Sequence, residues 1–131
     1  MFHSEMTLIN SPNAPAAVGP YSHAAQVGNL LFCSGQIPLD PETMKIVDGG
    51  IEAQTKQVLE NIGALLSTVG ASFGNVAKCT IFLTDLGDFA VVNGLYEEAF
   101  GQHKPARSTI QVAALPLGAN VEIECIVEMP L

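Results

Sequence analysis

The 131-residue sequence contains no tryptophan, only 6% aromatic residues, and five Lys and Arg residues against thirteen Asp and Glu. The formal net charge at pH 7 is −8, and the four lysines are scattered at positions 45, 56, 78 and 104. Proteins that bind a nucleic-acid backbone gather Lys and Arg on one surface. The composition therefore disfavours nucleic-acid binding.

Long apolar runs are also missing, since no stretch approaches the roughly 20 residues that a membrane-spanning helix needs. Residues 1–5 lack the basic start and apolar block of a signal peptide. Cys33, Cys79 and Cys125 are odd in number, widely spaced and flanked by apolar residues, which favours reduced core thiols over a disulfide framework. Neither the cysteines nor the three histidines have the spacing of metal ligands. We expect a cytoplasmic protein without a metal ion or organic cofactor.

The length and the lack of internal repeats predict a single domain over residues 1–131. Apolar residues at helical spacing predict one helix from Ile51 to a stop at Gly70, and a second from an N-cap at Asp88 to Gly101. Alternating and β-branched segments predict strands over residues 5–9, 21–27, 30–34, 76–83, 108–114 and 121–128. The order predicts an α+β fold, a mixed six-stranded sheet with two helices on one face.

Side chains alternate across each strand, so every strand can be sorted by face. In the last strand the apolar set predicts the helix-covered face, and Glu122 and Glu124 then lie on the opposite face. The same reasoning places Thr109, Gln111 and Arg107 on that opposite face. Two helices cannot cover both faces, and residues 30–34 are apolar on both sides. We therefore expect a homo-oligomer that covers the second face; the alternative is an exposed face that is merely apolar.

Arg107 is the only arginine in the chain. A guanidinium group can hold a carboxylate or a phosphate through two parallel charge-assisted hydrogen bonds. In so acidic a chain, Arg107 could equally form an ordinary ion pair with an Asp or Glu of its own. The residue type alone leaves both interpretations open.

Six short segments carry a resemblance to a known family. In chain order they are Gly19-Pro20-Tyr21, Ser34-Gly35-Gln36-Ile37-Pro38, Asp85-Leu86-Gly87-Asp88-Phe89, Val92-Asn93, Pro105-Ala106-Arg107-Ser108 and Val121-Glu122-Ile123-Glu124. Any one of them recurs by chance, but six in order are specific. Together they resemble the RidA (YjgF-like) family of enamine/imine deaminases, from about residue 15 to 127.

The resemblance implies a chorismate-mutase-like fold assembled as a homotrimer, with ligand clefts between neighbouring subunits. It also implies hydrolysis of reactive 2-enamine/2-imine acids, such as 2-aminoacrylate, to 2-keto acids and ammonia. Pyridoxal-phosphate dehydratases acting on serine and threonine release such intermediates. The implied activity is that of a 2-iminobutanoate/2-iminopropanoate deaminase, which removes reactive intermediates without a cofactor.

Position by position, the resemblance makes Arg107 the group that binds the substrate carboxylate and Glu122 the acidic group near the attacking water. Tyr21 matches a tyrosine of the cleft. Without the resemblance, Glu122 reads as a solvent-facing strand residue and Tyr21 as an aromatic that anchors a turn.

Ser34, Gly35 and Asn93 match further positions that line the cleft, although an asparagine within a helix is more often a solvated polar residue. Thr109 departs from the family, in which many members have cysteine at that position. A covalent or redox role there is therefore doubtful for this chain. The deaminase role is less affected if position 109 contributes its backbone N–H.

Three other functions compete with the deaminase. A chorismate-mutase-type pericyclase shares the architecture, but its dianionic substrate demands more cations than one arginine supplies. A non-catalytic protein that binds small 2-keto acids and regulates another process would need Arg107 but not Glu122. An RNA-cleaving role, reported for some members of the family, conflicts with the net negative charge.

Overall fold

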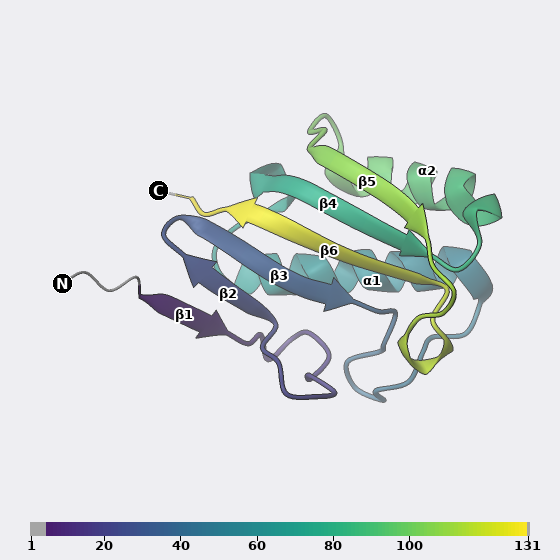
Figure 1. The fold of residues 1–131 in the computed structure, drawn as a ribbon, viewed down its shortest axis with the longest axis horizontal. Helices are drawn as coiled ribbons and strands as arrows, with labels where there is room; N and C mark the ends of the chain where they lie inside the picture. The colour runs from purple at the N-terminus through teal and green to yellow at the C-terminus, as the bar shows by residue number, and fades with distance from the viewer. Residues whose placement is uncertain (1–4, 131) are drawn as a thin grey trace.

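The computed structural model describes residues 5–130, which form one sheet, two α-helices and three short 3-10 turns (Figure 1). The strands are β1 (Met6–Ile9), β2 (Ala24–Val27), β3 (Leu30–Gln36), β4 (Val76–Leu83), β5 (Ala106–Gln111) and β6 (Val121–Glu128). The helices are α1 (Gly50–Thr68) and α2 (Phe89–Phe100), and the turns are η1 (Phe73–Asn75), η2 (Leu86–Asp88) and η3 (Pro116–Gly118). The strand order is β1-β2-β3-β6-β4-β5, antiparallel throughout except for the parallel pair β4 and β5.

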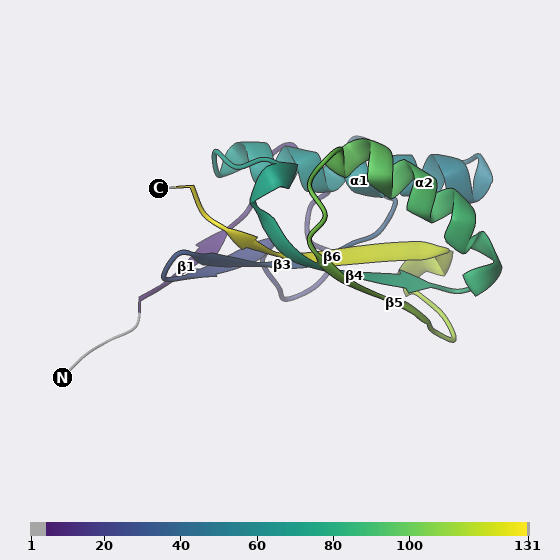
Figure 2. The ribbon, with the colours of Figure 1, turned by 90° about the horizontal axis from the view of Figure 1, so that it is seen from above.

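Both helices lie on the same face of the sheet, and the opposite face is open (Figure 2). The predicted α+β architecture, a mixed six-stranded sheet with two helices on one face, is confirmed. No helix within residues 5–130 combines the length and apolarity needed to cross a bilayer.

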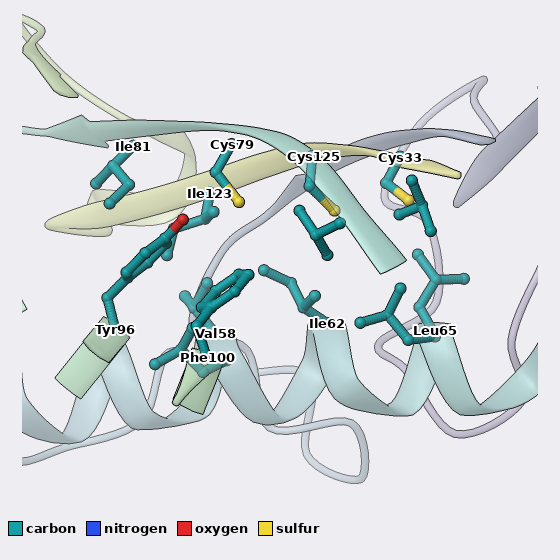
Figure 3. Close-up of a cluster of buried hydrophobic side chains, with 14 of the residues drawn as sticks. Cys33, Val58, Ile62, Leu65, Cys79, Ile81, Tyr96, Phe100, Ile123 and Cys125 are labelled. Atoms are coloured by element: carbon teal, nitrogen blue, oxygen red, sulfur yellow. The ribbon is translucent and has the colours of Figure 1, made fainter. Parts of the chain in front are cut away.

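The core fills the space between the sheet and the helices, and Figure 3 shows part of it. The predicted apolar stripe of α1 is buried there, including Val58, Ile62 and Leu65. Cys33, Cys125 and Cys79 are register partners on three neighbouring strands, and all three are buried free thiols, as the sequence predicted. A row of small thiols lets the helices approach the centre of the sheet closely.

Several element boundaries differ from the prediction by one to three residues. Strand β2 begins at Ala24 instead of residue 21, and β5 covers Ala106–Gln111 instead of residues 108–114. Asp88 precedes α2 but its side chain makes no capping bond; Asp85 instead accepts a hydrogen bond from the Gly87 N–H at 2.7 Å. The chain enters α2 through η2, so Asp85 is the last residue with the extended backbone that capping needs.

The predicted faces of β5 were wrong. Arg107 is the register partner of Cys79, and Thr109 is the partner of Ile81, in the parallel β4–β5 pair. Register partners share a face, so Arg107 and Thr109 (and likewise Gln111) lie on the helix side. Glu122 pairs with Phe82 and lies on the open side. The apolar residue Ile110 misled the assignment, because it faces the open side of an edge strand and is 45% exposed.

The open face is apolar near the β1 edge of the sheet. Met6, Val27 and Leu30 are register partners there, as are Leu8, Ala25 and Phe32. The large side chains of this set are 37–62% exposed. A patch of this kind on a small protein commonly marks a contact with another chain. The homo-oligomer remains a prediction, and this patch is the surface that we expect it to bury.

Candidate functional site

Arg107 lies on β5 beneath α2, where two aromatic rings flank its guanidinium group. The Cζ atom is 4.9 Å from the ring centroid of Tyr96 and 5.6 Å from that of Phe89. Aromatic faces attract a guanidinium and restrict its orientation without consuming its hydrogen-bond donors. Arg107 is half-buried, so it does not point into bulk solvent.

Within residues 5–130, Arg107 forms no ion pair with an acidic side chain. The only ion pair within residues 5–130 joins Lys56 to Glu52 at 3.1 Å on the exposed surface of α1. The interpretation of Arg107 as part of an ordinary intrachain ion pair therefore fails over this range. Its hydrogen-bond donors remain available for an anion from outside the chain.

Arg107 opens into a hollow of about 430 Å³ between α2 and the turn that follows it. Asn93 lines the same hollow, so the structure brings these two predicted residues together. The full lining consists of Asn93, Tyr96, Glu97, Phe100, Gly101, His103, Lys104, Pro105 and Arg107. Thr109 is half-buried on the same side of β5 but is not part of this lining.

Tyr96 supports Arg107 from within the core, and its hydroxyl points from α2 toward Cys79 (Figure 3). This hydroxyl is the only buried side-chain polar atom in residues 5–130 that lacks a hydrogen-bond partner of good geometry. Burial raises the pKa of Tyr96 strongly, and the neighbouring Cys79 thiol, a weak hydrogen-bond partner, raises it further. The ring of Tyr96 is therefore neutral and serves as an uncharged platform for the guanidinium.

Glu122 lies in a second hollow, of about 520 Å³, on the opposite side of the sheet. Tyr21, Ser34 and Gly35 line it as well, so four of the predicted residues meet here. Val18, Ile37, Pro116 and Glu124 complete the lining. Tyr21 is 47% exposed, and its hydroxyl accepts a hydrogen bond from the Val18 N–H at 3.3 Å.

The carboxylate of Glu122 lies directly over Gly35. A β-bulge between Cys33 and Gln36 displaces this part of β3 from the regular ladder. A Cβ atom at position 35 would lie 2.8 Å from Cδ and 3.0 Å from Cγ of Glu122, well inside ordinary contact distance. Burial, and then the charge of Glu124, raise the pKa of Glu122. Glu122 is thus a half-buried carboxyl that exchanges a proton more readily near neutrality than an exposed glutamate does.

Replacing Gly35 with alanine is expected to displace the Glu122 carboxylate and to lower the activity proposed below. A shift of about 1 Å at a reacting group costs on the order of a hundredfold in rate. The melting temperature should change little, because the group that moves is the end of a flexible side chain. Gly94→Ala is the control: nothing lies within 4 Å of a Cβ atom there, and alanine in mid-helix stabilises by about 0.5–1 kcal/mol. Full activity in Gly35→Ala would show that the position of the carboxylate is unimportant.

The predicted residues therefore divide into two groups on opposite faces of the sheet. Arg107 and Asn93 form one group; Glu122, Tyr21, Ser34 and Gly35 form the other. The sequence did not predict that Tyr96 and Phe89 support Arg107, because helical spacing placed both rings in the buried stripe of the second helix, whereas Phe89 is 38% exposed. It also missed Lys104 and His103, whose place beside Arg107 depends on the path of the turn after α2. Within residues 5–130, no three His, Cys, Asp or Glu side chains are grouped to hold a metal ion.

Residues 11–129 match the family model described as Endoribonuclease L-PSP. The 2-iminobutanoate/2-iminopropanoate deaminase of Mus musculus is 47% identical over 119 residues, which cover 91% of this chain and 88% of that protein. The crystal structure of RidA from an Antarctic Psychrobacter species superposes with a TM-score of 0.90 at 47% identity, covering 94% of this chain and 99% of that one. The chain belongs to the RidA (YjgF-like) family.

Membership in the RidA family confirms the resemblance found in the sequence, and it supports imine or enamine deaminase chemistry in general. Names within the family vary, however. Protein DfrA of Myxococcus xanthus is 55% identical over 120 residues, 90% of this chain and 92% of that protein, and its name states no activity. The roles of individual residues in this RidA-family chain must therefore be argued from its own geometry.

Proposed function

We propose that the protein hydrolyses reactive 2-enamine/2-imine acids, such as 2-aminoacrylate, to 2-keto acids and ammonia. The observation that carries the proposal is the pair of complementary half-sites on one chain. Arg107, which forms no ion pair within residues 5–130, opens into one hollow, and the half-buried Glu122 opens into another on the opposite face. The name of the mouse relative supports the same reaction.

The two hollows of one chain cannot act on the same small substrate, because the sheet separates them. A complete site forms where the Arg107 hollow of one subunit meets the Glu122 hollow of the next. Lys104 lies beside Arg107 and Glu124 lies beside Glu122, and these opposite charges favour that contact, whereas Glu97 in the Arg107 hollow opposes it. The apolar side chains that are exposed on the open face of a single chain become buried in a homo-oligomer, which we take to be a trimer.

The chemistry needs an anchor and a proton carrier. Arg107 holds the substrate carboxylate through two charge-assisted hydrogen bonds, each worth roughly 1.5–3 kcal/mol where water is excluded. The enamine takes up a proton on carbon and releases one from nitrogen to become the imine. Water then adds to the C=N carbon, and the nitrogen leaves as ammonia after protonation.

Glu122 orients the attacking water and accepts its proton, which it passes to the departing nitrogen. Tyr21 and Ser34 line the wall beside it, and Asn93 lines the arginine half. Since these substrates also hydrolyse unaided, positioning and modest acid–base help are sufficient.

Mixing two inactive variants tests the proposal directly. A serine or threonine dehydratase generates the intermediate, and the added protein should speed release of pyruvate or 2-oxobutanoate. Arg107→Ala and Glu122→Gln should each abolish most of that acceleration. Co-expression of the two variants with different affinity tags should restore part of the acceleration. With random assembly, about one quarter of the subunit contacts combine an intact Arg107 with an intact Glu122.

Each variant expressed with a differently tagged copy of itself is the control and should stay inactive. Mixed oligomers that stay inactive would show that the two residues do not share an intersubunit site. A wild-type protein that leaves the release of keto acid unchanged would refute the deaminase function itself.

A further inference from the structure

His23 is buried at the start of β2, with only 3% of its surface exposed, and its ring is held on both sides by backbone groups. The Ser11 N–H donates to Nδ1 at 2.9 Å, and Nε2 lies 2.7 Å from the Pro15 carbonyl oxygen. A backbone N–H can only donate and a carbonyl can only accept. The ring must therefore be neutral, with its proton on Nε2.

These bonds secure the loop between β1 and β2, which contains Tyr21. Within the same loop, Asn10 Oδ1 accepts a hydrogen bond from the His23 backbone N–H at 3.1 Å. The His23 carbonyl accepts from the Ser34 N–H at 2.9 Å, and Ser34 Oγ donates to the Ser22 carbonyl at 2.7 Å. His23 thus connects the loop to the part of β3 that lines the Glu122 hollow.

We propose that His23 is a positioning residue whose neutral ring holds Tyr21 and Ser34 in the Glu122 hollow, and that its protonation releases this loop. A protonated ring has an N–H at both nitrogens, so Nδ1–H would face the Ser11 N–H and that hydrogen bond would be lost. The half-site then loosens on acidification, because the folded loop accepts only the neutral ring. The inference rests on the proposed function for its effect on turnover, but not for the structural change.

Three acidic groups also face this loop, since Asp40, Glu42 and Glu60 line a hollow with Pro12 and Asn13, and all three remain in the variant His23→Gln described below. The hydrogen-bond partners of His23 are Ser11, Pro15, Asn10 and Ser34, none of which titrates. Tyr21 in the same loop and Cys33 next to Ser34 are the titratable neighbours along these segments, and both are neutral when protonated. Thr68 at the end of α1, which bonds Ser11 Oγ at 2.7 Å, is uncharged.

Hydrogen exchange of the Ser11 amide, followed by NMR from pH 8 to pH 5, tests the loop without reference to activity. Exchange rates are first corrected for intrinsic exchange. In the pH range where the released ring takes up a proton, protection of the wild-type Ser11 amide should then fall by up to about tenfold for each pH unit of acidification. The ring ¹⁵N signals of His23 should show the Nε2–H tautomer at pH 8. Protection that stays constant while His23 takes up its proton would overturn the proposal, as would the opposite tautomer.

His23→Gln separates positioning from mere packing. The glutamine amide offers one acceptor and one donor in place of the two ring nitrogens, but it does not titrate. The variant should keep Ser11 protection at acidic pH and should lose less deaminase activity there than the wild type does. His23→Ala should lower both at every pH.

Thr68→Val is the matched control, because it removes an anchor of Ser11 that cannot titrate. Relative to the wild type, it should lower the protection of the Ser11 amide by the same factor at every pH. An acid loss in His23→Gln equal to that of the wild type would overturn the proposal. If the wild type proves to have no deaminase activity, the proposed function fails, and the exchange and tautomer measurements still decide the role of His23.

Discussion

Arg107→Lys is expected to lose most of the acceleration of keto-acid release, about ten- to a hundredfold in apparent kcat/KM. Lysine keeps the positive charge but lacks the planar fork that holds both oxygens of a carboxylate. It also fits less well between the rings of Tyr96 and Phe89, where the guanidinium now lies. The measurement is the dehydratase-coupled assay at several concentrations of added protein, with spontaneous hydrolysis subtracted.

Lys56→Ala is the control for a general effect of charge. Lys56 pairs with Glu52 on the exposed surface of α1 and lines neither hollow, so its loss should leave the rate unchanged. A full rate in Arg107→Lys would mean that a point charge suffices and that the bidentate grip is the wrong account.

Glu122→Gln is expected to lower turnover by about a hundredfold or more, the usual contribution of a positioned acid–base group. Glutamine keeps the shape of the side chain over Gly35 but can neither accept nor deliver the proton. Binding of a stable 2-keto acid, measured by calorimetry, should survive, since Arg107 supplies the anchor. Glu128→Gln, on the same face of β6 but outside the hollow, is the matched control.

The pH dependence of the wild type provides a second test of Glu122. Because burial and Glu124 raise its pKa, the rate should begin to fall on acidification at a higher pH than an ordinary carboxylate would give. Measured in the His23→Gln background, this decrease no longer contains a contribution from His23. The same shift implies that ionised Glu122 costs stability, so Glu122→Gln should gain stability at neutral pH, and the gain should vanish in acid.

Undiminished turnover in Glu122→Gln would exclude the acid–base role. Loss of keto-acid binding in that variant would instead show that Glu122 shapes the binding site. A wild type that binds 2-keto acids without accelerating hydrolysis would favour the regulatory alternative.

Local patterns predicted the elements well. In α1 and β6 the apolar residues recur at the spacing of a helix and of a strand, respectively. The residues that this spacing predicted to be buried lie in the core or pack against it. The prediction failed at element ends, as at Asp88, where a 3-10 turn moves the cap three residues back to Asp85. Such turns depend on contacts with other segments, here the hydrogen bond from the Leu86 N–H to Gln111 Oε1 at 2.9 Å.

The candidate residues were found from short motifs, but their grouping was not. Gly35 and Glu122 are far apart in the chain, and only the pairing of β3 with β6, together with the bulge in β3, brings them into contact. Tyr96 has the spacing of an ordinary core residue of α2, and nothing in its sequence context shows that a guanidinium covers its ring.

The amino-acid sequence by itself determined the order of helices and strands, the apolar stripes and the residue types available for chemistry. Only the tertiary structure decided that Arg107 and Glu122 lie on opposite faces of the sheet. Alternation fixes that adjacent residues of a strand point in opposite directions, but not which of them faces the helices. That choice was made by the parallel register of β5 against β4, a contact between segments separated by the whole of α2.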